Sequence, residues 1–314
     1  MYKIGNYTLD EQQTQIVEDS AKHILVVAGA GSGKTLTILG KIKYLVQENI
    51  CNSEEILCIS FTKEASNSLK EKIYKELGID IDVYTFHKLG LEVLKQYEPF
   101  DIADSNTLVN IVHEFFSEDC LYNRENLKIV LKYFKLKNKQ EYTKFKDSIY
   151  FSKIENLFAT FIHLFKSNNH NLQNFIIFLR KSRNILNIKY YFDEKIFLRL
   201  ALNIYIKYET YLKENKEIDF DDMLIKSTDY VQEYGYKPVK YIIIDEFQDT
   251  SLVRFNLIKS ILDKTSASLM AVGDDFQSIY RFTGCDLDIF LNFKHYFPDA
   301  KILKIENTYR NSQE

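Results

Sequence analysis

The sequence is poor in the residues that interrupt helices and strands. Its 314 residues include only three prolines and ten glycines, and tryptophan is absent. Because proline and glycine break regular elements, their scarcity predicts long, uninterrupted elements, mostly helices. A hydrophobic fraction of 46% with 14% aromatic residues is enough for a buried core and excludes a disordered chain. The length suits about two domains.

Cysteine is also scarce, and its spacing excludes the common metal sites. Cys51, Cys58, Cys120 and Cys285 form no CxxC pair, so neither a zinc site nor an iron–sulfur cluster is supported. No signal peptide and no run near the ~18 apolar residues of a spanning helix is visible. Reduced thiols and the absence of membrane signals predict a cytoplasmic protein without a membrane partner. The net charge of −3 excludes a global basic field, although a basic cleft remains compatible with it.

Strand-like apolar runs occur at both ends of the chain and are missing from its middle. They cover residues 23–29, 56–60, 81–86, 241–247, 268–274 and 301–307. Helical patterns at 35–47 and 63–77 separate the first strands, which is typical of a doubly wound α/β sheet. The sequence therefore predicts one parallel-sheet domain, formed by residues 1–98 and 217–314. An all-helical insertion, residues 99–216, interrupts it.

A glycine-rich turn, AGAGSGKT, lies between the first strand and the helix that follows. Its backbone N–H groups can surround phosphate oxygens, and the helix N-terminus favours an anion. Lys34 would reach the β- and γ-phosphates of a nucleoside triphosphate, and the Thr35 hydroxyl would bind Mg²⁺. The predicted phosphate-binding residues are Ala28, Gly29, Ala30, Gly31, Ser32, Gly33, Lys34 and Thr35. Ala28 stands where the strict pattern has glycine.

Two acids follow a later strand in the segment YIIIDEFQDTS. Asp245 and Glu246 would lie at the carboxyl end of the strand, where open α/β sheets bind their ligands. Asp245 would hold Mg²⁺ through water, and Glu246 would polarise the attacking water. Two acids would also be favourable at an ordinary helix N-terminus. The phosphate-binding loop makes the catalytic interpretation the better one.

Six motifs occur in order along the chain. They are AGAGSGKT, TFHK, DFDDML, DEFQDTS, VGDDFQSIYRFTG and ENTYRNS. Together they resemble the UvrD/Rep branch of superfamily 1 DNA helicases, and GDDFQSIYRFTG with IDVYTFHKLGL is most similar to the DNA helicase IV group. The resemblance covers nearly the whole chain. It implies a RecA-like P-loop fold, hydrolysis of ATP with Mg²⁺, and 3′-to-5′ movement on single-stranded DNA or at a single/double-strand junction.

The resemblance assigns further residues to the nucleotide. Gln13 matches the glutamine that reads the adenine edge, and Tyr309 matches the tyrosine that stacks on adenine. Arg310 matches the arginine that reaches the γ-phosphate and stabilises the transition state. Gln277 matches the residue that senses the γ-phosphate.

Aromatic residues are expected to contact DNA by the same resemblance. Tyr280 and Phe282 match a segment that offers aromatic faces to single-stranded bases, and stacking contributes ~1–3 kcal/mol per base. Phe61, Phe86 and His87 match further contacts with the strand. Phe61 and Phe86 follow predicted strands, however, and could equally be core residues. His87 could be an ordinary helix-capping residue.

The predicted helical insertion contains a basic stretch. Between residues 121 and 150, eight basic residues and three acids give a local charge of +5. This stretch could bind DNA phosphates with an affinity that falls with salt. It could equally be a solvated helix face.

The resemblance also predicts a second RecA-like lobe C-terminal to this chain. The chain would then be the N-terminal ATPase lobe of a helicase and would not unwind DNA alone. Two alternatives stay open: a family ATPase in a nuclease or phage-defence complex, and an ATP-gated DNA-binding module without useful turnover. The intact Glu246 disfavours the second alternative, because losing that base is a simple route to a pure switch.

Overall fold

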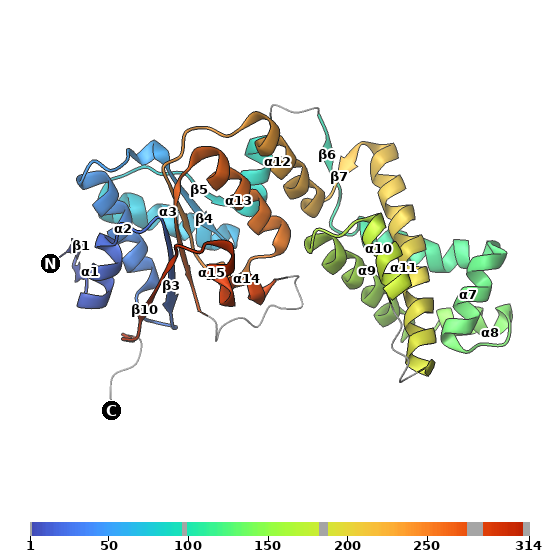
Figure 1. The fold of residues 1–314 in the computed structure, drawn as a ribbon. Helices are drawn as coiled ribbons and strands as arrows, with labels where there is room; N and C mark the ends of the chain where they lie inside the picture. Colours follow the sequence, from blue (N-terminus) through green and yellow to red (C-terminus); the bar gives the residue numbers. More distant parts are fainter. Residues whose placement is uncertain (1, 96–98, 182–187, 275–284, 310–314) are drawn as a thin grey trace. The chain divides into compact units, whose positions relative to one another are not determined.

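The computed structural model describes residues 2–95, 99–181, 188–274 and 285–309 (Figure 1). The chain divides into two compact units, one formed by residues 1–98 and 223–314, the other by residues 99–222. The sequence placed the second boundary at residue 216, whereas the helical unit continues to Asp222. Within the described ranges, no helix is long and apolar enough to cross a membrane.

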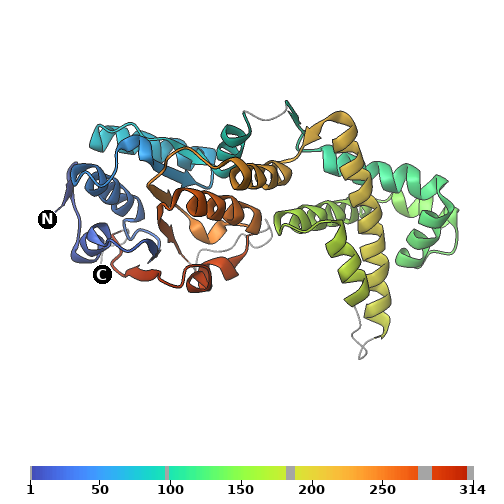
Figure 2. The ribbon, with the colours of Figure 1, turned by 45° about the horizontal axis from the view of Figure 1, so that its top comes forward.

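A six-stranded sheet with every strand pair parallel forms the centre of the first unit (Figures 1 and 2). Its order is β10-β3-β9-β8-β4-β5. The strands are β3 (His23–Ala28), β4 (Ile56–Ser60), β5 (Val83–Thr85), β8 (Tyr241–Ile244), β9 (Ser268–Gly273) and β10 (Lys301–Ile305). Each lies within one of the six apolar runs of the sequence. The predicted parallel α/β sheet is therefore confirmed.

The two faces of this sheet are covered by separate hydrophobic cores. Alternate residues of β8 point to opposite faces, as the period of a strand requires. Ile242 and Ile244 belong to a core shared with α4 (Phe86–Leu94) and α13 (Leu252–Thr265). Ile243 belongs to a core shared with α1 (Glu11–Glu18), α2 (Lys34–Gln47) and α3 (Lys63–Leu77). Burial on both faces explains why the strands read as continuous apolar runs.

Short elements complete the first unit. They are β1 (Lys3–Ile4), β2 (Tyr7–Thr8), η1 (Ser53–Glu55), η3 (Phe247–Asp249), α14 (Leu287–Leu291) and α15 (Phe293–Tyr296). The strands β1 and β2 form an antiparallel hairpin that the sequence did not predict. Gly5 in its turn has a φ of 56°, and a Cβ there would lie 1.9 Å from Oε2 of Glu76. The left-handed backbone favours glycine at this position, and a Cβ would in addition require the end of the Glu76 side chain to move.

The second unit is almost entirely helical. Its helices are α5 (Thr107–Glu114), the π-helical η2 (Phe115–Asp119), α6 (Cys120–Tyr122), α7 (Arg124–Phe134), α8 (Lys139–Lys146), α9 (Phe151–Ser167), α10 (Leu172–Lys181) and α11 (Ile188–Asn215). The strands β6 (Asp101–Ile102) and β7 (Glu217–Ile218) form a short parallel pair, an exception to the all-helical expectation. Phenylalanine rings fill the core, with Phe116 and Phe158 centred 5.2 Å apart. Helix α12 (Phe220–Tyr234) contains the boundary between the units.

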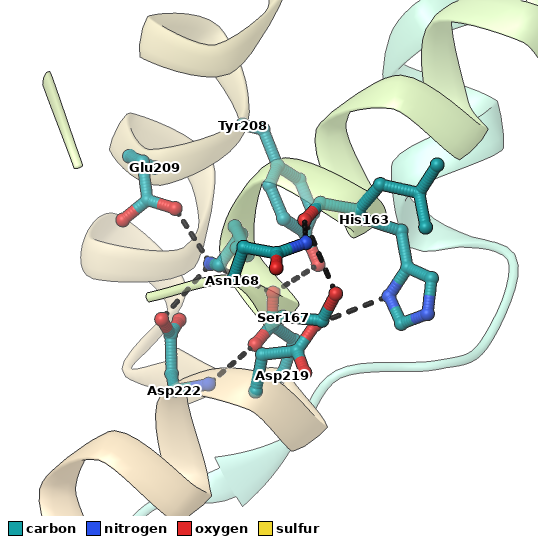
Figure 3. Close-up of polar contacts among 10 residues, drawn as sticks. His163, Ser167, Asn168, Tyr208, Glu209, Asp219 and Asp222 are labelled. Carbon is teal, nitrogen blue, oxygen red and sulfur yellow. Dashed lines mark hydrogen bonds and ion pairs between the residues drawn. The ribbon is translucent and has the colours of Figure 1, made fainter. Parts of the chain in front are cut away.

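A buried lysine of α9 pairs with one acid of α11 and with two acids at or just before the start of α12. Figure 3 labels these acids, Glu209, Asp219 and Asp222. The Nζ of Lys166 lies 2.6 Å from Glu209, 2.7 Å from Asp219 and 2.9 Å from Asp222, and its side chain is 3% exposed. Burial alone would lower the pKa of Lys166, but these carboxylates raise it well above its ordinary value. The Tyr208 hydroxyl donates to Asp219 over 3.1 Å. Two acids of the DFDDML motif, Asp219 and Asp222, therefore pair with a buried lysine.

Candidate ATP-binding site

The loop after β3 has the geometry of a phosphate-binding turn. Gly33 is the N-cap of α2 with φ 84° and ψ 27°, in the left-handed region that glycine adopts without strain. A Cβ on Gly33 would lie 2.4 Å from Nε2 of Gln13, so close packing requires glycine as well. Lys34 and Thr35 form the first turn of α2. The helix N-terminus there favours a bound anion.

The acids after β8 meet the phosphate-binding loop at the carboxyl edge of the sheet. Asp245 directly follows β8, and its N–H donates to the carbonyl of Ile59 over 2.9 Å. The Nζ of Lys34 lies 3.0 Å from Oε2 and 3.2 Å from Oε1 of Glu246. The Gln248 amide donates to Oε2 of Glu246 over 2.9 Å and so orients the carboxylate. The structure thus brings together Lys34 and Glu246, which the sequence assigned to catalysis, and places them beside Asp245, which it assigned to Mg²⁺.

The electrostatics at this edge favour a bound cation. Burial raises the pKa of Asp245 to about 6, and the neighbouring Glu246 adds to this, although Lys34 and Lys72 oppose it. Asp249 behaves similarly: burial and Glu246 raise its pKa to about 6. The carboxylate of Asp245 and the hydroxyl of Thr35 are oxygen ligands of the kind Mg²⁺ prefers. Mg²⁺ usually keeps several waters and binds substrate phosphates together with only one or two protein groups.

A cavity of about 860 Å³ lies over the loop. It is lined by Ile4, Tyr7, Thr8, Gln13, Ala30, Gly31, Gly33, Lys34, Thr35, Leu36, Leu39, Lys72, Lys75, Glu76, Glu246 and Tyr309. The lining includes the basic side chains of Lys34, Lys72 and Lys75 and apolar side chains from β1 and α2. Such a wall suits a ligand with both a polyanionic and an apolar part.

Gln13 and Tyr309, the residues assigned to adenine, both line this cavity. Gln13 is 1% exposed. Its Nε2 donates to the Ser32 carbonyl over 3.1 Å, and its Oε1 accepts from the N–H of Asp10 over 3.1 Å. Tyr309 is 62% exposed, and its N–H donates to the Gly31 carbonyl over 2.9 Å. The structure thus places both side chains beside the phosphate-binding loop.

The residues expected to contact DNA fall into different environments. Phe61 is half-buried, and its ring packs against the guanidinium of Arg254, with 4.7 Å between the Arg254 Cζ and the ring centroid. His87 is also half-buried. Phe86 is 3% exposed and belongs to the core beneath the sheet. In this conformation Phe86 presents no face to a base, which corrects the expectation of an accessible ring. The core interpretation, which the sequence left open, is the one that the burial of Phe86 supports.

Four predicted residues lie outside the described residues. They are Gln277, Tyr280, Phe282 and Arg310. Their roles at the nucleotide and on DNA stay predictions.

The structure adds residues that sequence reasoning missed. Gln248 orients Glu246, and Arg254 packs on Phe61. Lys72 lines the cavity from α3. Asp10 caps α1 and accepts a hydrogen bond from Tyr309. Only the cap had a local signal, because aspartate with glutamine three residues later is typical of a capping box.

The fold and the site define a RecA-like P-loop nucleotide-binding domain carrying a helical insertion. Residues 9–298 match the family model described as UvrD/REP helicase N-terminal domain. The chain therefore belongs to the UvrD/REP helicase family, as the order of its motifs predicted.

The similar proteins are named as helicases. The ATP-dependent DNA helicase Rep of Buchnera aphidicola subsp. Schizaphis graminum is 29% identical over 97% of this chain and 42% of its own length. The ATP-dependent DNA helicase PcrA of Staphylococcus aureus is 26% identical over 97% of this chain and 38% of its own length. The chain thus spans about two fifths of the length of these curated relatives. The finer similarity to the helicase IV group stays a prediction.

Proposed function

We propose that the first unit binds and hydrolyses Mg·ATP, and that the chain supplies the N-terminal ATPase lobe of a DNA helicase. The observation that carries this proposal is the convergence of Lys34 and Glu246, with Asp245 beside them, at the carboxyl edge of the sheet. Membership of the helicase family and the names of the relatives support it.

The chemistry follows from the side chains at this edge. Backbone N–H groups of residues 29–33 and the N-terminus of α2 would bind the β- and γ-phosphates. Lys34 would move from Glu246 to the phosphates and neutralise their charge. Glu246, released from its ion pair and held by Gln248, would then accept a proton from the attacking water.

Asp245 and Thr35 would hold Mg²⁺ at the phosphates. The ion would neutralise charge that develops on the β- and γ-oxygens. A bound cation would also offset the burial cost of the Asp245 carboxylate, whose pKa is raised to about 6 by burial and by Glu246. Arg310 is proposed to add a positive charge at the γ-phosphate.

The finer parts of the function are proposals that rest on family membership. Gln13 and Tyr309 would bind adenine, and Gln277 would report the γ-phosphate to Tyr280 and Phe282 on single-stranded DNA. Together with a second RecA-like lobe, this relay would drive movement in the 3′-to-5′ direction. The length of the relatives supports such a lobe, because they are more than twice as long as the matched chain.

Hydrolysis of ATP by the protein, with and without oligo(dT), tests the proposal. We expect turnover that oligo(dT) stimulates and that both Lys34→Ala and Glu246→Gln abolish. Nucleotide affinity separates the variants, because Glu246→Gln should keep binding and Lys34→Ala should lose it. Hydrolysis that persists in both variants would contradict the proposed site.

Streptavidin displacement from biotinylated single strands, measured with the second RecA-like lobe present, tests the polarity. A protein that moves 3′ to 5′ displaces streptavidin from the 5′ end and leaves it bound at the 3′ end. The reverse pattern would overturn the proposed direction without affecting the ATP site.

A further inference from the structure

The carboxylate of Asp10 bonds to two segments that are far apart in the sequence. Its Oδ1 accepts from the N–H of Gln13 over 2.7 Å and caps α1. Its Oδ2 accepts from the side-chain amide of Asn307 over 3.2 Å and from the hydroxyl of Tyr309. One side chain thus contacts both residues assigned to adenine.

The segment that carries Tyr309 is fixed to the same neighbourhood by further bonds. The N–H of Glu306 donates to Oε1 of Gln12 over 2.9 Å. The hydroxyl of Thr308 donates to the Ala30 carbonyl over 3.2 Å, and the N–H of Tyr309 donates to the Gly31 carbonyl over 2.9 Å. The backbone of Tyr309 is therefore tied to the phosphate-binding loop, while its hydroxyl is tied to α1.

The bond between Asp10 and Tyr309 is charge-assisted. Burial would raise the pKa of Asp10, but hydrogen bonds from Gln13, Tyr309 and Asn307 outweigh it and lower the pKa below its ordinary value. The bond to Asp10 in turn raises the pKa of Tyr309. The pair is thus a carboxylate accepting from a neutral phenol throughout the neutral pH range, and such bonds are stronger than neutral ones.

We propose that Asp10 is a positioning residue for recognition of the purine base. It holds the ring of Tyr309 over the cavity and, through the same carboxylate, fixes the first turn of α1 that carries Gln13. A ring that is 62% exposed would otherwise lose rotamer freedom when a base stacks on it, which reduces affinity. Fixing the ring beforehand removes that cost. This inference rests on the proposed ATP site.

Two substitutions separate the positioning role from the helix cap. Asp10→Ser keeps a good N-cap residue but removes the oxygen that reaches Tyr309. Tyr309→Phe keeps the ring and removes the hydroxyl, and it leaves the cap of α1 untouched. If Asp10→Ser does not fold, Tyr309→Phe still tests the bond.

The readout is the affinity for ATP compared with that for inorganic tripolyphosphate, measured by calorimetric titration with Mg²⁺. We expect each variant to bind ATP about tenfold more weakly than the wild type, because one such hydrogen bond contributes about that factor to affinity. Each variant should bind tripolyphosphate with the affinity of the wild type. The double variant should bind ATP no more weakly than Asp10→Ser alone, because that substitution already removes the bond to Tyr309. Equal losses for ATP and tripolyphosphate, or unchanged ATP affinity, would overturn the inference.

Lys34→Ala distinguishes this inference from the proposed function. It should weaken binding of both ATP and tripolyphosphate, because Lys34 acts on phosphates. If Lys34→Ala binds both ligands as the wild type does, the proposed ATP site fails. If only the Asp10 and Tyr309 variants behave as the wild type, the positioning role fails and the ATP site stands.

Discussion

Lys34 and Glu246 form an ion pair, with 3.0 Å between Nζ and Oε2. Their side chains are 13% and 33% exposed, so solvent screens the pair only in part. The lysine lies in the first turn of α2, the helix that follows β3, and the glutamate lies just after β8. In the sheet, β9 separates β3 from β8. The ion pair joins the phosphate-binding lysine to the proposed general base, so phosphate and base compete for one cation.

The backbone of Glu246 is in a conformation that costs free energy. Its φ of 53° and ψ of 44° lie in the left-handed region, which costs a residue with a Cβ about 1 kcal/mol. We expect Glu246→Gly to have a free energy of unfolding about 1 kcal/mol higher than Glu246→Ala, although both lose hydrolysis. Urea unfolding of the two variants measures this difference. An alanine variant as stable as the glycine variant would show that no strain is stored there.

Lys41 predicts a pH dependence of stability. Its Nζ is buried in α2 and donates to the carbonyls of Val17 and Asp19 over 2.9 and 2.7 Å. Burial lowers the pKa of Lys41 to about 8, although Asp19 and Cys51 oppose this. The rings of Tyr44 and Tyr241 also face the ammonium.

Between the folded pKa and the unfolded value of about 10.4, the unfolded chain binds a proton at this lysine that the folded chain lacks. The contribution of Lys41 to the free energy of unfolding therefore rises as pH increases from about 8 to about 10.4, by on the order of 2 kcal/mol. Lys41→Met should lose this part of the rise. Urea unfolding of both proteins at pH 7.5 and pH 10 measures the difference, and identical pH dependences would refute it.

The buried lysine of the helical unit should be far more important for stability than a partly exposed one. Lys166→Met leaves three carboxylates around an apolar side chain, and breaking a buried ion pair in this way costs roughly 3–5 kcal/mol. Lys207 is the matched control, because it also contacts two carboxylates, Glu114 and Asp119, but its side chain is 24% exposed. Lys207→Met should cost about 1 kcal/mol or less.

Hydrogen exchange in the helical unit measures both effects. Burial, with the carboxylate of Asp219, raises the pKa of Asp222, so charge at Asp222 is already disfavoured. Adding Asp222→Asn to Lys166→Met should therefore recover part of the lost stability. A Lys166→Met variant as stable as Lys207→Met would contradict this description of the cluster.

Phe61 and Phe86 should respond to truncation in opposite ways. Phe86→Ala removes a ring from the core and should lower the free energy of unfolding by roughly 3–5 kcal/mol. Phe61→Ala should change the free energy of unfolding little. It should weaken binding of oligo(dT) by about the contribution of one base–aromatic stacking contact. Fluorescence anisotropy with labelled oligo(dT), together with urea unfolding, separates the two. Tighter or equal DNA binding by Phe61→Ala would remove Phe61 from the DNA contacts.

The sheet and its phosphate-binding loop could be predicted because their signals are local. Strands buried on both faces are short apolar runs, and β8 is the example: all four residues, Tyr241–Ile244, are buried. The spacing of glycines before Lys34 is likewise readable over a few residues. Because parallel strands end at one edge, the positions of Asp245 and Glu246 near Lys34 followed from the topology.

The remaining features depend on contacts between distant residues. Asp10 and Tyr309 are joined only in the folded chain, and nothing local marks the pair. The three carboxylates around Lys166 come from two separate segments, and no local pattern in the sequence links them to the lysine. Phe86 follows a strand, as an exposed aromatic also could, and only its packing against helices on the same face of the sheet shows that it is a core residue.

Binding of Mg·ATP to the wild-type chain and to Lys34→Ala, measured by calorimetric titration, tests the central claim most directly. The site described here predicts saturable binding by the wild type that Lys34→Ala weakens by at least about tenfold, since a charged hydrogen bond to phosphate is lost. Glu246→Gln should bind at least as tightly as the wild type, because Lys34 then has no carboxylate competing for it. Wild-type affinity in Lys34→Ala would contradict the ATP site and, with it, the proposed ATPase lobe.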